Sequence, residues 1–319
     1  MPPTGRACLL RTMITALLAH PDSFLHEVPE GHPERPARLD AVLRALESMD
    51  LLRVEPSEAT DEQILRAHPP EHLEALVAAA PHEGLVPVDA DTWLSPGSLR
   101  AARLAAGAAV QAVDMVMAGE ATRAFCAMRP PGHHAEQARA MGFCLLGNVA
   151  IAAKHALDHH GLSRVAIVDF DVHHGNGTQA LVQDDPRILF ASTHQMPLYP
   201  GTGAPDDRGP HGTVINVALS DGTDGAGFRA AVERDVMPAV DAFVPELLFI
   251  SAGFDAHARD PLAGLELQAE DFGRVTRALC DLADIHAGGR VVSVLEGGYD
   301  LRALGESVAA HVDELAGRG

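Results

Sequence analysis

The chain alternates between short apolar runs and longer stretches rich in alanine and leucine. Several of the short runs contain many β-branched residues and break off at polar or glycine residues. Continuous apolar runs of this length are typical of strands that are covered on both faces, as in a parallel sheet. They predict strands at residues 13–19, 121–128, 164–170, 187–191, 213–219, 246–250 and 290–295.

The stretches between these runs have the composition of amphipathic or buried helices. They predict helices at residues 36–49, 71–80, 98–118, 147–160, 227–243, 269–286 and 302–316. Strands that alternate with helices indicate an α/β fold with a doubly wound, mostly parallel sheet flanked by helices. Neither a repeat nor a long linker divides the chain, so we expect one domain over residues 13–319 and an extension outside the fold at residues 1–12. A ligand of such a fold binds beyond the carboxyl ends of the strands.

The net charge of the chain disfavours some classes of binding partner. Lys and Arg number 24 against 44 Asp and Glu, which gives 24 − 44 = −20 with His neutral. An acidic surface repels nucleic acid and anionic lipid and attracts basic substrates. The four cysteines form no CxxC pair, which disfavours a zinc ribbon or a disulfide framework and fits a reducing cytoplasm. No apolar run reaches the roughly 20 residues of a membrane span, so we expect none.

Metal-binding residue types follow two of the predicted strands. Asp171 and His173 stand two residues apart after the run at 164–170, where an extended strand would point both side chains the same way, and Asp255 follows the run at 246–250. Carboxylate and imidazole are zinc ligands, and three of them leave a position for water and substrate, as in catalytic sites. The alternatives are a solvated loop and a helix-capping Asp. A binuclear manganese site of the arginase type needs a further Asp at the position of Gly175, so one metal is expected.

Two further segments carry groups for proton transfer. His133 and His134 follow a rigid Pro-Pro-Gly turn, and such a pair can supply a general base and acid near neutral pH. Asp169 and Asn176 are the expected hydrogen-bond partners that orient these imidazoles. Tyr299 follows two glycines after the last predicted strand and can donate to an oxyanion. A surface His pair and a packed structural Tyr are the alternatives.

Taken in their order, these segments resemble the histone deacetylase family over about residues 20–310. Each match is weak alone, whereas the ordered set is specific, and Asn rather than Asp at 176 resembles the class II branch and its bacterial relatives. The matching segments are residues 32–38, 129–136, 142–144, 148–153, 169–177, 199–203, 251–255 and 296–299.

The resemblance implies a catalytic centre with one Zn²⁺ per chain, held by Asp171, His173 and Asp255. By the same resemblance His134 acts as general base and then acid, and His133 is its electrostatic partner. Asp169 and Asn176 support this pair, and Tyr299 polarises the amide carbonyl.

Substrate contacts and a second cation are implied in the same way. Phe143, with the adjoining Gly142, and Tyr199 line a tunnel for the acyl-lysine side chain, and Arg38 is associated with acetate release. A structural potassium ion is expected near Asp169, Asp171, His173 and Ser192.

The identity of the substrate depends on one position. Polyamine-selective relatives place a Glu directly after the Asp-Pro pair, and this chain has Leu262 there. An acyl-lysine protein or peptide is therefore favoured over an acetylpolyamine or another small acetylated amine. A catalytically idle binding protein is the third reading, but it would have lost a ligand, the His pair or the Tyr. The oligomeric state is left open by these residues.

Overall fold

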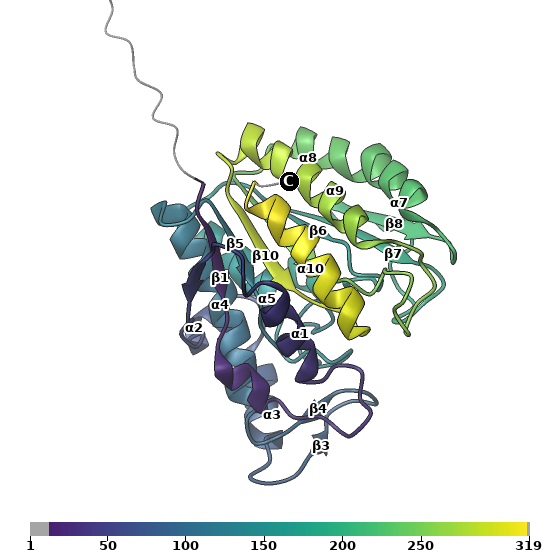
Figure 1. Ribbon diagram of the computed structural model, residues 1–319. Coiled ribbons are helices and arrows are strands. Elements are labelled where there is room, and N and C mark those ends of the chain that lie inside the picture. The colour runs from purple at the N-terminus through teal and green to yellow at the C-terminus, as the bar shows by residue number, and fades with distance from the viewer. Residues whose placement is uncertain (1–12, 318–319) are drawn as a thin grey trace, which may run out of the picture.

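All strand pairings in the central sheet are parallel (Figure 1). The computed structural model describes residues 13–317, so the expected extension at residues 1–12 lies outside them. The strand order is β2-β1-β5-β10-β9-β6-β7-β8. The strands are β1 (Thr15–Leu18), β2 (Leu52–Val54), β5 (Arg123–Cys126), β6 (Val165–Asp169), β7 (Ile188–Gln195), β8 (Val214–Leu219), β9 (Leu247–Ala252) and β10 (Val291–Leu295). A two-stranded hairpin of β3 (Val86–Pro87) and β4 (Trp93–Leu94) lies apart from this sheet.

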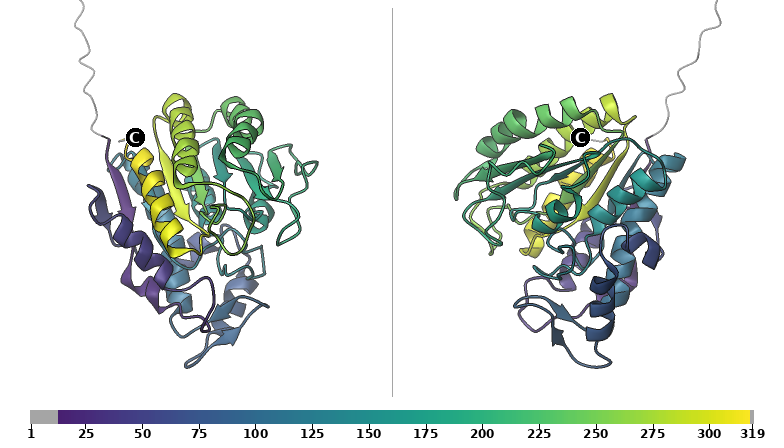
Figure 2. Two further views of the ribbon diagram at one scale, coloured as in Figure 1. Left: turned by 45° about the vertical axis from the view of Figure 1, so that its right-hand side comes forward. Right: turned by 180° about the vertical axis from the view of Figure 1, so that it is seen from behind.

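Helices cover both faces of the sheet, as Figure 2 shows, so the prediction of a doubly wound α/β fold is confirmed. Neighbouring strand residues point to opposite faces, and both faces are apolar: Leu17 packs in one core cluster, Ala16 and Leu18 in the other. One face is covered by α4 (Ser98–Ala118) and α5 (Asn148–Asp158). The opposite face is covered by α1 (Ala37–Ala45), η2 (Val232–Val236), α8 (Met237–Phe243), α9 (Ala269–His286) and α10 (Leu301–Leu315). The remaining helices are η1 (Pro21–Leu25), α2 (Asp61–Ile64), α3 (Pro70–Ala79), α6 (Asn176–Val182) and α7 (Gly225–Ala231).

One helix, α4, is long and apolar enough to cross a membrane by length and composition alone, although Arg100, Arg103 and Asp114 interrupt its apolar run. Within its most apolar window, 72% is buried inside the fold. A helix that packs between a sheet and other helices is apolar for that reason alone, so this match is weak evidence of a span.

Several boundaries differ from the sequence-based expectation for local reasons. The run at 187–191 continues as strand β7 through the polar residues to Gln195, because β8 pairs with it along that length. The helix expected at 227–243 is divided into α7, the π-helical turn η2 and α8. Strand β2 is short and lies at the sheet edge, with two of its three residues exposed, so it lacked an apolar run.

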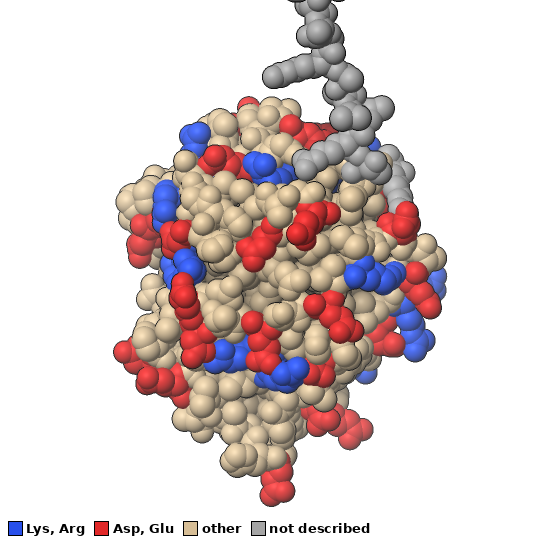
Figure 3. Space-filling model, turned by 90° about the vertical axis from the view of Figure 1, so that its left-hand side faces the viewer, with Lys and Arg blue, Asp and Glu red and all other residues tan. Residues whose placement is uncertain are grey.

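Four adjacent strands place their carboxyl ends side by side. In the order β5, β10, β9 and β6, these ends lead into the His133 segment, the Tyr299 segment, Asp255, and the Asp171 segment. Polar groups far apart in the sequence therefore meet at one edge of the sheet. Elsewhere the surface carries both signs of charge, and Figure 3 shows acidic and basic side chains interspersed on one face.

Candidate active site

Three metal-ligating side chains face one another beyond β6 and β9. The donor atoms of Asp171, His173 and Asp255 lie within 4.8 Å of one another, and all three residues are buried. His173 Nδ1 lies 3.1 Å from Asp171 Oδ1 and 3.2 Å from Asp255 Oδ2. One imidazole thus stands between two carboxylates.

A turn, rather than the extended strand we expected, aims Asp171 and His173 at each other. Strand β6 ends at Asp169, and the backbone N–H of His173 donates to Asp171 Oδ1 at 2.9 Å. The N–H of Gly297 donates to the other oxygen, Asp171 Oδ2, at 2.8 Å, and the N–H of Val172 donates to Asp255 Oδ1 at 2.8 Å. These bonds fix both carboxylates from the backbone.

The residues present fit a divalent cation. Asp255 Oδ2 is buried, and apart from the contact with His173 Nδ1, itself a candidate ligand, no hydrogen bond from the described residues pairs with it, which is costly for a carboxylate without a cation. A Cβ at Gly297 would overlap the carboxylates of Asp255 and Asp171, so the glycine leaves room above them. Burial by itself would lower the pKa of His173, but hydrogen bonds and charge from Asp171 and Asp255 raise it to about 10. The same negative field attracts a metal ion, and the donor set is one that zinc accepts.

The two histidines after β5 lie beside this centre and have different partners. His133 Nδ1 lies 3.0 Å from Asp169 Oδ2, and His134 Nδ1 lies 2.7 Å from Asn176 Oδ1. Asn176 Nδ2 donates to Glu136 Oε1 at 2.7 Å, which turns its carbonyl oxygen toward His134. His134 Nδ1 must therefore donate, and the lone pair of the neutral ring is on Nε2.

The electrostatic surroundings separate the two imidazoles. Burial lowers the pKa of His133, but the carboxylates of Asp171 and Asp169 outweigh it and hold that pKa well above its ordinary value. Burial, together with the neighbouring His133 and His173, keeps the pKa of His134 well below its ordinary value. His133 is thus a cation and His134 a neutral acceptor.

A pocket of about 240 Å³ opens above the centre. Its inner residues are His134, His173 and Tyr299, and its walls are mainly apolar or aromatic. The remaining lining residues are Asp91, Gly142, Phe143, Leu198, Tyr199 and Leu262. The pocket therefore combines a polar interior with walls suited to an aliphatic chain.

An unusual backbone places Phe143 in the pocket wall. Both Gly142 (φ +56°) and Phe143 (φ +67°) are in the left-handed region, which is rare for a residue with a side chain. Gly142 N donates to Asp91 Oδ1 at 3.2 Å, and Phe143 N donates to Thr92 Oγ1 at 3.0 Å. A Cβ at Gly142 would overlap the ring of His134, so the close approach requires glycine.

Tyr299 is held from its backbone and from its ring. Its N–H donates to Asp260 Oδ2 at 2.7 Å, and the guanidinium of Arg38 lies 4.9 Å from the centre of its ring. Arg38 also donates to the carbonyls of Gly298 (2.6 Å) and Glu296 (2.5 Å). The loop that carries Tyr299 is thereby fixed to α1.

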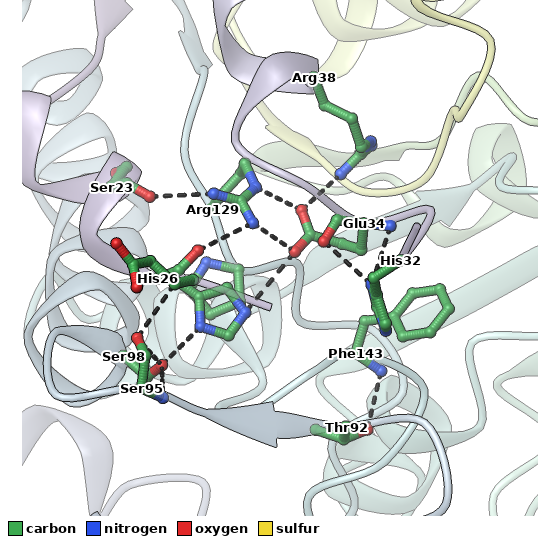
Figure 4. A network of polar contacts seen from close by, with 12 residues as sticks. Ser23, His26, His32, Glu34, Arg38, Thr92, Ser95, Ser98, Arg129 and Phe143 are labelled. Atoms are coloured by element: carbon green, nitrogen blue, oxygen red, sulfur yellow. Dashed lines mark hydrogen bonds and ion pairs between the residues drawn. The ribbon is translucent and has the colours of Figure 1, made fainter. Parts of the chain in front are cut away.

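A buried ion network joins this loop to the His133 segment. Figure 4 shows Glu34 between Arg129 and Arg38, with His26 beside it. Burial would raise the pKa of Glu34, but Arg129 and Arg38 lower it to about 2. His32 packs edge-on against Phe143, with ring centres 4.7 Å apart. The residues of the 32–38 segment thus support the pocket from beneath.

The region suggested for potassium is built from paired strands. Asp169 and Ser192 are register partners on β6 and β7, and Asp171 N donates to Asp169 Oδ1 at 3.1 Å. Ser192 Oγ lies 3.0 Å from His194 Nδ1. A potassium ion in this region stays a prediction.

Sequence reasoning missed three residues of the site. Asp91 lines the pocket, and Asp260 holds the backbone of Tyr299; burial raises the pKa of Asp260 to about 7. Glu34 lay in a motif already noted but had no assigned role. Asp260 likewise lay in the Asp-Pro pair before Leu262, whereas Asp91 had no signal beyond being an acidic residue in a loop, which is common on protein surfaces.

The chain is similar to known proteins in both sequence and structure. The sequence-family model of the histone deacetylase domain matches residues 32–315 of this chain. The chain is 42% identical to a histone deacetylase-like amidohydrolase of Pseudomonas aeruginosa over 297 residues, 90% of this chain and 77% of that protein. It is 39% identical to the polyamine deacetylase HDAC10 of Homo sapiens over 328 residues, 96% of this chain and 48% of that protein. The crystal structure of the HDA15 HD domain matches with a TM-score of 0.91 and 36% identity, over 96% of this chain and 89% of that one.

Proposed function

Because this chain belongs to the histone deacetylase family, we propose that it is a zinc-dependent amidohydrolase that removes acyl groups from lysine side chains of proteins or peptides. The observation that carries the proposal is the set of Asp171, His173 and Asp255 at the inner end of an apolar pocket, next to a neutral His134. A hydrolytic metal ion, a base and an apolar channel are what amide hydrolysis of an acylated chain requires.

One Zn²⁺ held by Asp171, His173 and Asp255 would supply Lewis-acid polarisation of the amide carbonyl and would make a water molecule more acidic. His134 has its lone pair on Nε2 and can accept the proton of the water that attacks the carbonyl carbon. His133, held as a cation between two Asp residues, favours the negative charge that develops nearby. The Tyr299 hydroxyl donates to the developing oxyanion.

The reaction then completes by proton return. His134 delivers the proton to the leaving nitrogen, the C–N bond breaks, and the new C–O bond remains in the carboxylate product. For an acetylated lysine the products are acetate and a free amine. Phe143, Tyr199 and Leu262 would hold the aliphatic side chain during these steps, and Arg38, beneath Tyr299, is the proposed contact for departing acetate.

Leu262 supports a lysine substrate over a polyamine. An acetylpolyamine carries at least one free ammonium group beyond its acetylated end, and this group binds best where a carboxylate meets it. Leu262 in the pocket wall offers only apolar contact. Because one relative is named as a polyamine deacetylase, a small acetylated amine is the competing candidate for the substrate.

A direct comparison of substrates tests the proposal. We expect the zinc-loaded enzyme to hydrolyse an acetyl-lysine peptide with a higher kcat/KM than N-acetylputrescine or acetylspermidine, and a chelator to abolish turnover until zinc is restored. A Leu262→Glu variant should shift the preference toward acetylspermidine, whereas Leu198→Glu, a carboxylate elsewhere on the same wall, is the matched control. If the unaltered enzyme preferred an acetylpolyamine, the proposed lysine substrate would be wrong and the polyamine would take its place. If it cleaved none of the three compounds, the proposed function would be rejected.

The proposed compartment is the reducing cytoplasm. Cys126, Cys144 and Cys280 are buried free thiols, and such thiols persist where no oxidising machinery operates.

A further inference from the structure

A second group of potential metal ligands lies on the face of the sheet that α4 and α5 cover, away from the proposed catalytic site. Within residues 13–317, Asp114, His155, His159 and His160 each offer a donor atom, and these atoms lie within 4.8 Å of one another. Asp114 is in the last turns of α4. The three histidines occupy the end of α5 and the residues that follow it.

The histidines meet at a single carboxylate. His155 Nε2 lies 2.8 Å and His160 Nε2 lies 2.7 Å from the same oxygen, Asp114 Oδ1. The His159 ring stacks on His155 with centres 4.7 Å apart and meets His160 edge-on at 4.9 Å. Burial raises the pKa of Asp114, but the two hydrogen-bonded imidazoles outweigh it and lower the pKa, so the carboxylate is ionised at neutral pH.

Hydrogen bonding alone accounts poorly for this arrangement. The Nδ1 atom of His155 is buried and has no hydrogen-bond partner among the described residues, so no second contact fixes its tautomer. His159 contributes ring contacts but no described hydrogen bond to Asp114. A cation at the centre would use the lone pairs of all three rings, because a neutral imidazole can move its proton to the other nitrogen.

The helix geometry also favours a cation here. His155 and His159 stand four residues apart, which puts them on one face of α5. The carboxyl ends of α4 and α5, which pack side by side, place the negative ends of two helix dipoles near the cluster (Figure 2). Ligand atoms around a tetrahedral zinc lie about 3.3 Å apart, given bonds of about 2.0–2.1 Å. The His155 and His160 nitrogens lie somewhat closer than this to Asp114 Oδ1, at 2.8 and 2.7 Å, so a bound ion would move them slightly apart, and the exposed His159 has room to adjust.

The cluster is distinct from the proposed catalytic centre. Helix α5 begins at Asn148, whose side chain donates to the Pro130 carbonyl beside the His133 segment, and the cluster lies at its other end. A helix of 11 residues spans roughly 16 Å. The cluster thus lies toward the amino ends of the strands, whereas the catalytic groups lie at the carboxyl ends.

We propose that Asp114, His155, His159 and His160 bind one divalent transition-metal ion such as Zn²⁺, which ties the end of α5 to α4. Three imidazoles and one carboxylate are ligands for Zn²⁺, Co²⁺, Ni²⁺ or Cu²⁺, whereas Mg²⁺ and Ca²⁺ prefer oxygen donors. Four protein ligands make a closed, structural site. This proposal replaces the sequence-based expectation of one zinc per chain with two metal ions, one at each site.

Metal stoichiometry in tag-free protein tests this proposal. The full chain is stripped with a chelator, dialysed and titrated with Zn²⁺ by calorimetry, and Co²⁺ absorption reports the ligand geometry. We expect two equivalents of bound Zn²⁺ per chain in the unaltered protein. The double variant His159→Gln/His160→Gln should bind one equivalent and should keep its deacetylase activity. Asp255→Ala, in the catalytic centre, should keep the cluster's equivalent and lose the other.

The controls separate this cluster from ordinary surface pairs. His286 Nε2 lies 2.7 Å from Asp241 Oδ1 at the end of α9, so His286→Gln removes an isolated His–Asp pair and should leave both equivalents bound. Asp114→Asn, which keeps the shape but removes the charge, should weaken the second site at least tenfold. A single equivalent in the unaltered protein, or a second equivalent that survives in both cluster variants, would overturn the proposal.

Discussion

Glu34 is the group whose removal should most clearly reveal how the site is held together. Its carboxylate is fully buried and accepts hydrogen bonds from Arg129 at 2.5 and 2.7 Å and from Arg38 at 3.0 Å. Arg38 in turn fixes the loop of Tyr299, and Arg129 precedes the His133 turn. Replacing Glu34 with Gln keeps the shape but leaves two buried guanidinium groups without their counter-charge.

The expected cost follows from the pKa of Glu34. Burial would raise this pKa, yet the two arginines lower it from 4.5 to about 2. That difference corresponds to about 3 kcal/mol of folded-state stability when the carboxylate is ionised. Breaking a buried ion pair from one side costs a similar amount, about 3–5 kcal/mol. Because the folded pKa is depressed, this stability is fully present above about pH 4.5 and is lost as the pH falls toward 2.

Denaturant unfolding at pH 7 measures this cost. We expect Glu34→Gln to lower the free energy of unfolding by about 3 kcal/mol, and we expect the difference from the unaltered protein to shrink below pH 4.5. Glu306 is the matched control, because it also accepts from two arginines, Arg302 and Arg259, but at the surface, where water replaces the lost bonds. Glu34→Asp, which keeps the charge, should recover part of the loss. If Glu34→Gln were no more harmful than Glu306→Gln, the reasoning from burial and pairing would be wrong.

Three further outcomes are expected at the proposed catalytic site. Tyr299→Phe should keep the fold and the metal but lower kcat about 10²–10³-fold with little change in KM, whereas a Tyr that only packs would leave turnover near normal; steady-state kinetics on an acetyl-lysine peptide decide between them. Gly142→Ala should lower kcat at least tenfold, because the added Cβ meets the His134 ring, while Gly212→Ala, with a similarly positive φ but open surroundings, should not; equal effects in the two variants would contradict the role of the close approach. Asp255→Ala should release the catalytic zinc and abolish activity, as measured by metal analysis after dialysis, and an intact metal site in that variant would reject Asp255 as a ligand.

The amino-acid sequence by itself determined the layer architecture and singled out most of the candidate site residues. Strands buried on both faces must be apolar throughout, so runs such as 164–170 and 290–295 stand out without any partner in view. The polar residues directly after those runs, among them Asp171 and Tyr299, had to meet at one edge, because parallel strands end on the same side. Local spacing and strand polarity were sufficient for this inference.

Only the tertiary structure decided the contacts that depend on distant segments. Strand β2 forms because an edge is available beside β1, and its exposed residues carry no apolar signal. Glu34 becomes a buried anion because Arg129, 95 residues away, packs against it, and Asp114 acquires its histidines because α4 and α5 lie side by side. The sequence does not distinguish an acidic residue that is exposed to solvent from one that is buried against a guanidinium group. The charge, the pKa and the role of such a residue come from neighbours that only the folded chain brings together.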